Sequence, residues 1–333
     1  MSDKKILRLG TLVICGAILL RLTTGAWAPA VQAARQLQLG QVLLFLQTGR
    51  IVRYAPIPEQ TTQQIAPTPT AEGTPVFSET DQSFVQLRND SGLSADLPAA
   101  LLQTLQWDLC QDAPSVLIIH SHGSESYTQT ETYKETSPYR TQDTGYNMIS
   151  IGDLLATELE AAGIRVIHDR TMYDVPSYNN AYVQARTAIE SHLKENPSIQ
   201  LVLDLHRDAA TDSAGNQIRY SVTTAEGEAA KLMLVLGTNH DGWTGNLALA
   251  AKLQVQLERL CPGISRPTNL RAQRFNQDLC SNTLLVEVGA TGNTRQEALT
   301  ATKYLAQAII RLASGANQPP SSPETPDSPH PQS

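Results

Sequence analysis

The sequence has few cysteines, few aromatic residues and a shortage of positive charge, and these shortages exclude several classes of protein. Four cysteines occur in 333 residues, and none forms a Cys-x-x-Cys pair, which argues against a thiolate zinc knuckle or a dithiol redox motif. Lys and Arg number 25 against 32 Asp and Glu. The formal net charge of -7 excludes a general nucleic-acid binder, because phosphate contact needs a basic surface. The absence of a Gly-x-Ser-x-Gly elbow argues against a serine nucleophile.

The N-terminus carries an export signal. Lysine and arginine residues precede an apolar run at 9–20, which continues beyond Arg21. Basic residues in front of an apolar stretch stay on the cytoplasmic side of the membrane, so the chain that follows is exported. We expect residues 1–35 to remain as an N-terminal membrane anchor. The alternative is a signal segment that is cleaved near Ala33, after which the protein is secreted. In both cases the rest of the protein is extracytoplasmic.

The remaining chain divides by composition. Residues 36–96 contain an amphipathic segment and then a Pro/Thr-rich linker, residues 97–313 have the composition of a folded domain, and residues 314–333 form a polar, proline-rich tail. Disulfides form outside the cytoplasm, so Cys261 and Cys280, which are close in sequence, are favoured as a pair. Cys110 would then be left over. The alternative is that all three cysteines are small buried residues.

The folded domain is predicted to alternate strands and helices. We expect strands at 116–119, 164–167, 201–205, 218–223, 232–236 and 284–288, and helices at 147–162, 178–194, 246–260 and 295–312. Strands that are separated by helices predict an α/β fold with a mainly parallel central sheet flanked by helices. In such folds the active site lies at the carboxyl ends of the strands.

Histidines follow three of these predicted strands. His120 and His122 follow the first strand, His206 the third and His240 the fifth, while Glu287 interrupts the apolar run of the last. Because the carboxyl ends of parallel strands meet at one edge of a sheet, we expect all of these side chains to converge there. A buried carboxylate costs several kcal/mol unless a cation or hydrogen bonds stabilise it, and a metal ion would supply that cation.

The ligand types favour zinc. Two imidazoles and a carboxylate, with one position left for water, are a usual set for catalytic zinc. His122 and His206 are the expected ligands, and Glu287 is the expected base that accepts a proton from the water. His120 and Asp204 are expected to support the ligands by hydrogen bonding, although either could have a purely structural role.

Several longer blocks of the domain resemble the stage II sporulation protein P family. They are LIIHSHGSESY, YNMISIGDLLATELEAAGI, IHDRTMYDVPSYNNAY, NPSIQLVLDLHRDA, LMLVLGTNHDGWTGNLALAAKLQ and SNTLLVEVGATGNT. The resemblance extends from about Ser115 to Ile309 and keeps the blocks in order. Several long blocks in sequence are more specific than any single short motif.

The resemblance implies a zinc-dependent N-acetylmuramoyl-L-alanine amidase fold and activity. The family cleaves the amide between muramic acid and the stem peptide of peptidoglycan, and it is credited with endopeptidase activity on cross-links. It acts on the septal wall during engulfment in sporulation, with a lytic transglycosylase, stage II sporulation protein D, as its partner. By the family's motif, His122 and His206 match the zinc histidines and Glu287 matches the catalytic glutamate.

The resemblance leaves the third ligand open. Related amidases carry a glutamate ligand just before the Asn that starts the first long helix, and here Asp143 is the carboxylate in that stretch, with Glu125 as the alternative. The resemblance, together with strand-end positions, also implies a set of substrate-binding residues, namely Arg207, Asp208, Asn239, His240 and Trp243; for His240 a structural role is the alternative. Two competing hypotheses are a non-catalytic wall-binding scaffold with the same fold and a different zinc hydrolase, such as a peptidase or a carbohydrate deacetylase.

Overall fold

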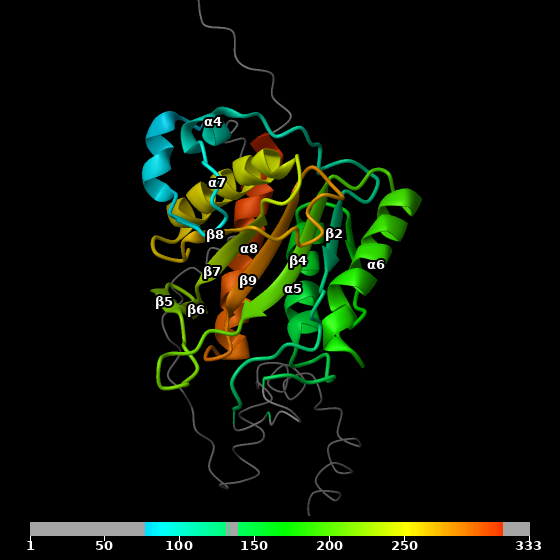
Figure 1. Cartoon of the computed structure of the whole chain (residues 1–333), viewed down its shortest axis with the longest axis vertical. Coiled ribbons are helices and arrows are strands. Elements are labelled where there is room, and N and C mark those ends of the chain that lie inside the picture. Colours follow the sequence, from blue (N-terminus) through cyan, green and yellow to red (C-terminus); the bar gives the residue numbers. More distant parts are fainter. Residues whose placement is uncertain (1–76, 131–132, 134–138, 316–333) are drawn as a thin grey trace, which may run out of the picture. The chain divides into compact units, whose positions relative to one another are not determined.

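The computed structural model describes residues 77–130, 133 and 139–315 (Figure 1). The expected anchor, most of the linker and nearly all of the expected tail lie outside these residues. Within the described part of the chain, no helix combines the length and the apolar character that a membrane crossing requires.

A seven-stranded sheet in the order β1-β8-β7-β9-β4-β2-β3 forms the centre of the domain. Its strands are β1 (Leu87–Asn89), β2 (Val116–Ile119), β3 (Val166–His168), β4 (Leu201–Asp208), β7 (Leu232–Gly237), β8 (Thr268–Arg271) and β9 (Thr283–Ala290). A separate antiparallel hairpin consists of β5 (Ser221–Thr224) and β6 (Gly227–Ala230). The four central strands β2, β4, β7 and β9 are apolar on both faces, as expected of buried strands, apart from the polar residues that form the candidate site described below.

The sheet changes direction between β9 and β7. Strands β3, β2, β4 and β9 are parallel to one another, whereas β7 pairs with β9 in the antiparallel sense, and β8 and β1 are parallel to β7. The connection from β4 to β7 contains only the β5–β6 hairpin and no helix. A parallel pair needs a long crossover, usually a helix, to return the chain to its starting edge. Without that crossover, β7 begins at the edge where β4 ends and runs the opposite way.

Helices cover both faces of the sheet, as the sequence predicted. They are α4 (Leu97–Leu102), α5 (Met148–Ala161), α6 (Ala181–Glu195), α7 (Trp243–Leu260) and α8 (Arg295–Gly315), with 3-10 turns η1 (Glu79–Phe84) and η2 (Tyr178–Asn180). Helix α6 packs on one face, over Leu117, Ile119 and Val202. Helices α5, α7 and α8 pack together on the other face, which carries the largest apolar core. Figure 1 shows α6 standing in front of the sheet, with α5 and α8 behind it.

The six predicted strands and four predicted helices all have counterparts, with shifts of a few residues at their ends. The pattern missed the short strands β1, β6 and β8 and the short helix α4, because segments of three to six residues are too short to display a period. The sheet already includes Leu87–Asn89, so the folded chain begins N-terminal to the boundary expected at Leu97. The favoured pairing of Cys261 with Cys280 is wrong: both thiols are free.

Candidate metal centre

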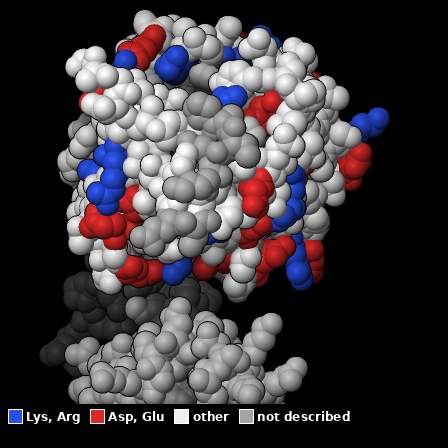
Figure 2. Space-filling view, turned by 90° about the horizontal axis from the view of Figure 1, so that it is seen from below, with Lys and Arg blue, Asp and Glu red and all other residues white. Residues whose placement is uncertain are grey.

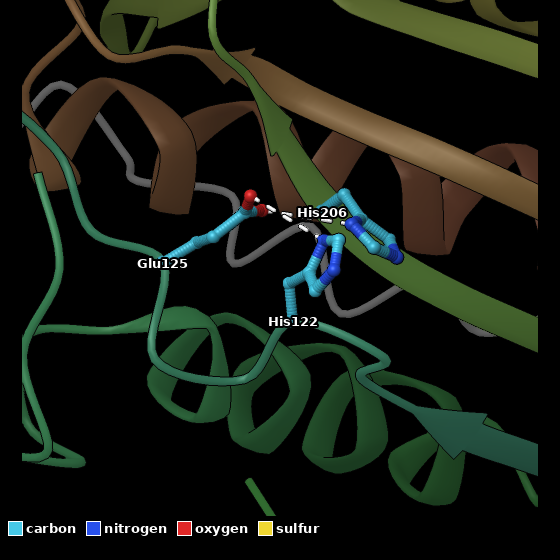
Figure 3. A group of neighbouring side chains, drawn as sticks. All are labelled: His122, Glu125 and His206. Atoms are coloured by element: carbon cyan, nitrogen blue, oxygen red, sulfur yellow. Dashed lines mark ion pairs between the residues drawn. The ribbon is translucent and has the colours of Figure 1, made fainter. Parts of the chain in front are cut away.

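Three buried side chains, His122, Glu125 and His206, converge beside the end of β4 (Figure 3). His122 and Glu125 lie in the loop that follows β2, and His206 lies on β4 itself. The Nδ1 atom of His122 is 3.7 Å from Oε1 of Glu125, and Nδ1 of His206 is 3.5 Å from Oε2 of the same carboxylate. One ligand atom from each of the three residues lies within 4.8 Å of the others.

This arrangement fits a zinc ion. Ligand atoms about 2.0–2.2 Å from a tetrahedral zinc are about 3.3–3.6 Å apart, close to the two observed separations between a histidine nitrogen and the Glu125 carboxylate. Two imidazoles and one carboxylate are also the donor set that catalytic zinc prefers. Of the two carboxylates that the sequence offered as third ligand, Glu125 belongs to the cluster. Asp143 is exposed, and its Oδ1 accepts a hydrogen bond from the Gly145 N–H in its own turn.

Glu125 is held as a charged carboxylate by the residue that follows His206. The backbone N–H of Arg207 donates to Oε2 of Glu125, and the guanidinium of Arg207 lies 3.4 Å from Oε1. Burial by itself would raise the pKa of Glu125, but the positive charge of Arg207, with His206 and His122, lowers it to about 2. Arg207 also donates to the backbone carbonyls of Ser126 and Tyr139, so it ties the loop to the sheet.

Asp204 lies beside the Nε2 atom of His206 and orients the imidazole ring. Its Oδ1 lies 2.9 Å from Nε2 of His206, a short separation with poor hydrogen-bond alignment, so the contact is mainly electrostatic. The carboxylate of Asp204 is fixed by the N–H and hydroxyl of Ser121. Burial would lower the pKa of His206, but Asp204, the Tyr182 phenol and Glu125 together raise it well above its usual value. With Nε2 facing Asp204, Nδ1 is the nitrogen that faces the cluster.

Glu287 lies next to His206 on the neighbouring strand. The two residues are paired in the register of β4 and β9, so their side chains project from the same face of the sheet. Oε2 of Glu287 is buried and has no hydrogen-bond partner among the described residues. Burial raises the pKa of Glu287 to about 8; the carboxylates of Glu125 and Asp208 add to this and His206 opposes it. The position and pKa suit a group that exchanges a proton near neutral pH.

The loop that carries His122 and Glu125 is fixed by the start of α5. The side chain of Asn147 caps α5 by accepting from the Ile149 N–H, and its amide donates to the carbonyl of Thr141. The Met148 N–H donates to the backbone carbonyl of Glu125, and the Ser124 carbonyl accepts from Thr141. The segment that begins at Tyr146 therefore fixes the loop that carries His122 and Glu125 through the hydrogen bonds at the start of α5.

Two tyrosines that sequence reasoning did not single out lie against His122 and His206. The Tyr178 ring stacks on His122 with centroids 4.2 Å apart, and the Arg140 guanidinium lies 4.0 Å from the centroid of the Tyr178 ring. The Tyr182 ring lies 5.3 Å from that of His122 and 6.1 Å from that of His206. The two tyrosines are four residues apart at the start of a predicted helix. Residues at this spacing lie on the same face of a helix, and this was the signal that both contact one site.

His120 belongs to a different group, on the opposite face of the sheet from His206. Its Nδ1 is 3.2 Å from the carbonyl oxygen of Leu205, and its Nε2 is 2.8 Å from Nε2 of His168. The other nitrogen of His168 lies 3.1 Å from Oδ1 of Asp153. Burial lowers the pKa of His120 to about 3, with His168 adding to the effect. His120 thus supports the strand that carries His206 rather than the ligands directly.

The expected convergence of all the strand-end residues was wrong for one group. Asn239, His240 and Trp243 follow β7, whose end pairs with the beginning of β9, so they lie at the opposite edge of the sheet from the metal centre. There, Asn239 and His240 line a separate cavity of about 540 Å³. The prediction assumed a parallel β7, and the missing helix between β4 and β7 was the signal against it. Arg207 and Asp208, in contrast, lie at the end of β4 beside the centre.

Comparison with protein families gives one match that covers most of the chain. The family model described as Stage II sporulation protein P (SpoIIP) matches residues 55–310. The protein named Stage II sporulation protein P from Bacillus subtilis (strain 168) is 26% identical over 200 residues, which are 56% of this chain and 48% of that protein. The chain therefore spans about half the length of this curated relative.

Comparison with solved structures gives more distant similarities. The CwlD amidase from Clostridioides difficile, in complex with the GerS lipoprotein, matches with a TM-score of 0.38 and 13% identity, covering 59% of this chain and 94% of that one. An N-acetylmuramoyl-L-alanine amidase from Clostridium difficile 630 matches with a TM-score of 0.38 and 14% identity, covering 60% and 95% respectively.

Proposed function

Because this chain belongs to the stage II sporulation protein P family, we propose that it is a zinc-dependent N-acetylmuramoyl-L-alanine amidase that acts on peptidoglycan during sporulation. The observation that carries the proposal is the buried group of His122, Glu125 and His206 with the partnerless carboxyl of Glu287 beside it. A scaffold would gain nothing from a buried carboxyl without a partner, which costs free energy of folding. The geometry therefore favours catalysis over wall binding alone.

Each residue has a role in the proposed hydrolysis. His122, Glu125 and His206 would hold the zinc, which when bound lowers the pKa of a coordinated water to about 7. Glu287 accepts the proton of the attacking water and returns it to the amine that leaves. Asp204 orients His206, and Arg207 keeps Glu125 ionised. Cleavage would separate muramic acid from its stem peptide.

We further propose where the protein acts, with which partner, and on which second bond. Residues 1–35 anchor the protein to the cell membrane, so that the domain acts in the extracytoplasmic space on the septal wall. A lytic transglycosylase resembling stage II sporulation protein D acts with it on the glycan that remains. The same centre also cuts peptide cross-links, since both reactions are amide hydrolysis.

The test combines metal analysis with hydrolysis of purified peptidoglycan by the full-length protein. We expect about one zinc per chain and the release of intact stem peptides, identified by mass spectrometry. Glu287→Gln keeps the shape of the side chain and should retain zinc, while the rate falls by about 10²–10⁴. Glu226→Gln, an exposed carboxylate that is paired with Lys303, is the matched control and should leave the rate unchanged.

Two results would contradict the proposal. Unchanged hydrolysis in Glu287→Gln would remove that residue from the mechanism. Wild-type protein that holds zinc but releases acetate or split cross-links, and no intact stem peptide, would instead indicate a deacetylase or a peptidase.

A further inference from the structure

A second polar cavity, of about 440 Å³, opens at the same edge of the sheet as the metal centre. Its walls come from the segment before β7, from the end of α7 and the segment that follows it, and from β5. Because β7 begins beside the end of β9, this cavity lies at the edge where His206 and Glu287 are found. We call it the cationic pocket and define it by Arg219, Lys231, Ser265 and Arg266.

Several hydrogen-bond donors in the cationic pocket have no partner. The Nη1 atom of Arg266 and the hydroxyl of Ser265 are buried without a hydrogen bond among the described residues. Lys231 is half-buried, and no described carboxylate lies within ion-pairing distance of its ammonium group. Buried donors are almost always satisfied, and leaving one unsatisfied costs free energy. Donors left free around one cavity indicate a ligand that accepts hydrogen bonds.

The pocket is preorganised and is joined to the metal centre. The guanidinium of Arg266 is fixed by an ion pair of 2.8 Å with Asp208 and by stacking over the Tyr220 ring at 3.8 Å. Asp208 is the last residue of β4, two residues after His206. A ligand group held by Arg266 would therefore lie beside the end of the strand that carries His206.

The carboxylates near the pocket do not occupy the free donors. Both oxygens of Glu258 accept backbone N–H groups, from Gly263 and Ser265. Glu297 is bonded to Arg219, and Asp208 takes the other terminal nitrogen of Arg266. Among the described residues, the pocket thus presents the half-buried ammonium of Lys231, and next to it two buried donors without a partner, Nη1 of Arg266 and the hydroxyl of Ser265. Such a set binds a planar anion with two oxygens.

Figure 2 views the molecule from below Figure 1, the side towards which β4 runs. Lys and Arg residues alternate with Asp and Glu round the visible face and do not form a broad basic patch. The acidic side chains nearest the pocket are Glu258 in its lining and Asp208 on Arg266, so the pocket suits a single carboxylate better than an extended polyanion.

We propose that the cationic pocket is a substrate subsite that binds a free carboxylate of the peptide whose amide bond lies at the metal centre. This inference rests on the proposed amidase function, since it identifies the substrate as a peptide that carries a carboxylate. Lys231 and Arg266 are the residues that select for this group, and Ser265 adds a neutral hydrogen bond.

The first test measures binding without catalysis. The full-length protein, freed of metal with a chelator, is titrated calorimetrically with a stem tripeptide that ends in a carboxylate and with the same peptide ending in a carboxamide. We expect wild type to bind the carboxylate about tenfold more tightly, the usual value of one charge-assisted hydrogen bond. Lys231→Met should abolish that preference. Lys303→Met, at an exposed ion pair with Glu226, should retain it.

The second test measures cleavage of wall fragments with free and amidated carboxyl groups. Wild type should cleave the free form with about tenfold higher kcat/KM, chiefly through KM, and Lys231→Met should cleave both equally. If wild type cleaves both forms equally, the subsite is overturned and the amidase proposal stands. If wild type cleaves neither but still prefers the carboxylate peptide in the titration, the subsite stands and the amidase proposal fails.

Two controls keep the result decisive. Inorganic phosphate is titrated in parallel; loss of phosphate binding in Lys231→Met without any preference between the peptides would overturn the proposal in favour of a simple anion site. Circular dichroism shows whether Lys231→Met folds. If it does not fold, the comparison of the two peptides on wild type decides the matter. Ser265→Ala then replaces Lys231→Met as the variant, and its preference for the carboxylate peptide should fall by about threefold.

Discussion

The sheet carries two pairs of buried histidines on opposite faces, and only one of them is suited to hold a metal ion. His122 and His206 lie on the face covered by α6, whereas His120 and His168 lie on the face covered by α5. Both pairs are largely buried and both have a carboxylate nearby. The two pairs differ in how many of their ring nitrogens already have a close partner within the protein.

In the α5-side pair, all four ring nitrogens have partners, which are Leu205 O, the other histidine and Asp153. In the α6-side pair, each histidine turns one nitrogen towards Glu125 at a distance too long for a good hydrogen bond. Burial of a histidine ring therefore does not by itself indicate metal binding. A ring nitrogen without a close hydrogen-bond partner is the better indicator. Two of the predictions below test this difference directly, and one tests the buried carboxyl of Glu287 beside the α6-side pair; they run from the largest expected effect to the smallest.

Removal of one histidine from each pair should separate the two roles. His206→Ala should lower zinc affinity by more than the 10–100-fold that is typical of losing a supporting residue, because it removes a ligand itself. His168→Ala should leave zinc affinity within a few-fold of wild type. Zinc content and competition with a fluorescent chelator provide the measurement. Equal losses of zinc in both variants would mean that the two pairs are not independent.

The stability of the metal-free protein should depend on pH through Glu287. Its pKa is raised from 4.5 to about 8 in the folded protein, so its contribution to stability is complete below pH 4.5 and is lost as pH rises to about 8. The free energy of unfolding should fall with a slope of up to about 1.4 kcal/mol per pH unit in this window. Urea unfolding of wild type and Glu287→Gln, both with chelator, measures it. A difference between the two proteins that stays constant from pH 5 to 8 would show that Glu287 is not buried as described.

Crowding at Gly152 should perturb only the α5-side pair. A Cβ atom there would clash with Nε2 of His168 and would lie 2.6 Å from Nε2 of His120. Gly152→Ala should therefore destabilise the protein by about 1–3 kcal/mol, as expected of overpacking, with zinc affinity unchanged. Gly245→Ala, whose nearest neighbour would be a carbonyl at 3.5 Å, is the control and should be neutral or slightly stabilising. Thermal unfolding with and without zinc compares them, and a loss of zinc in Gly152→Ala would contradict the separation of the pairs.

Much of the architecture follows from local pattern. The apolar runs at Val116–Ile119, Leu201–Asp208 and Thr283–Ala290 are long enough to specify buried strands, and the polar residues within or just after them mark the functional edge. The candidate metal site of His122, His206 and Glu287 was predicted from this pattern because a buried charge in an apolar strand needs a compensating partner. Their roles remain predictions until zinc and activity are measured.

The third ligand could not be chosen from the sequence. Asp143 lies just before the first long helix and Glu125 lies in the loop just after His122, and a carboxylate in a loop carries no periodic signal. Only the folded loop, clamped by Asn147 and Arg207, brings Glu125 within reach of both histidines and leaves Asp143 exposed. Loop conformation depends on contacts between residues far apart in the chain.

By itself, the sequence determined the order of the main elements, the α/β class and the chemical type of the centre, because hydrophobic period and buried polar residues are local properties. Tertiary structure alone decided the free state of Cys261 and Cys280 and the position of the cationic pocket. The antiparallel direction of β7 had one signal in the sequence, the missing helix after β4, because a parallel strand needs a long crossover. A cavity and a cysteine pairing depend on which distant segments meet, and no local pattern encodes those contacts.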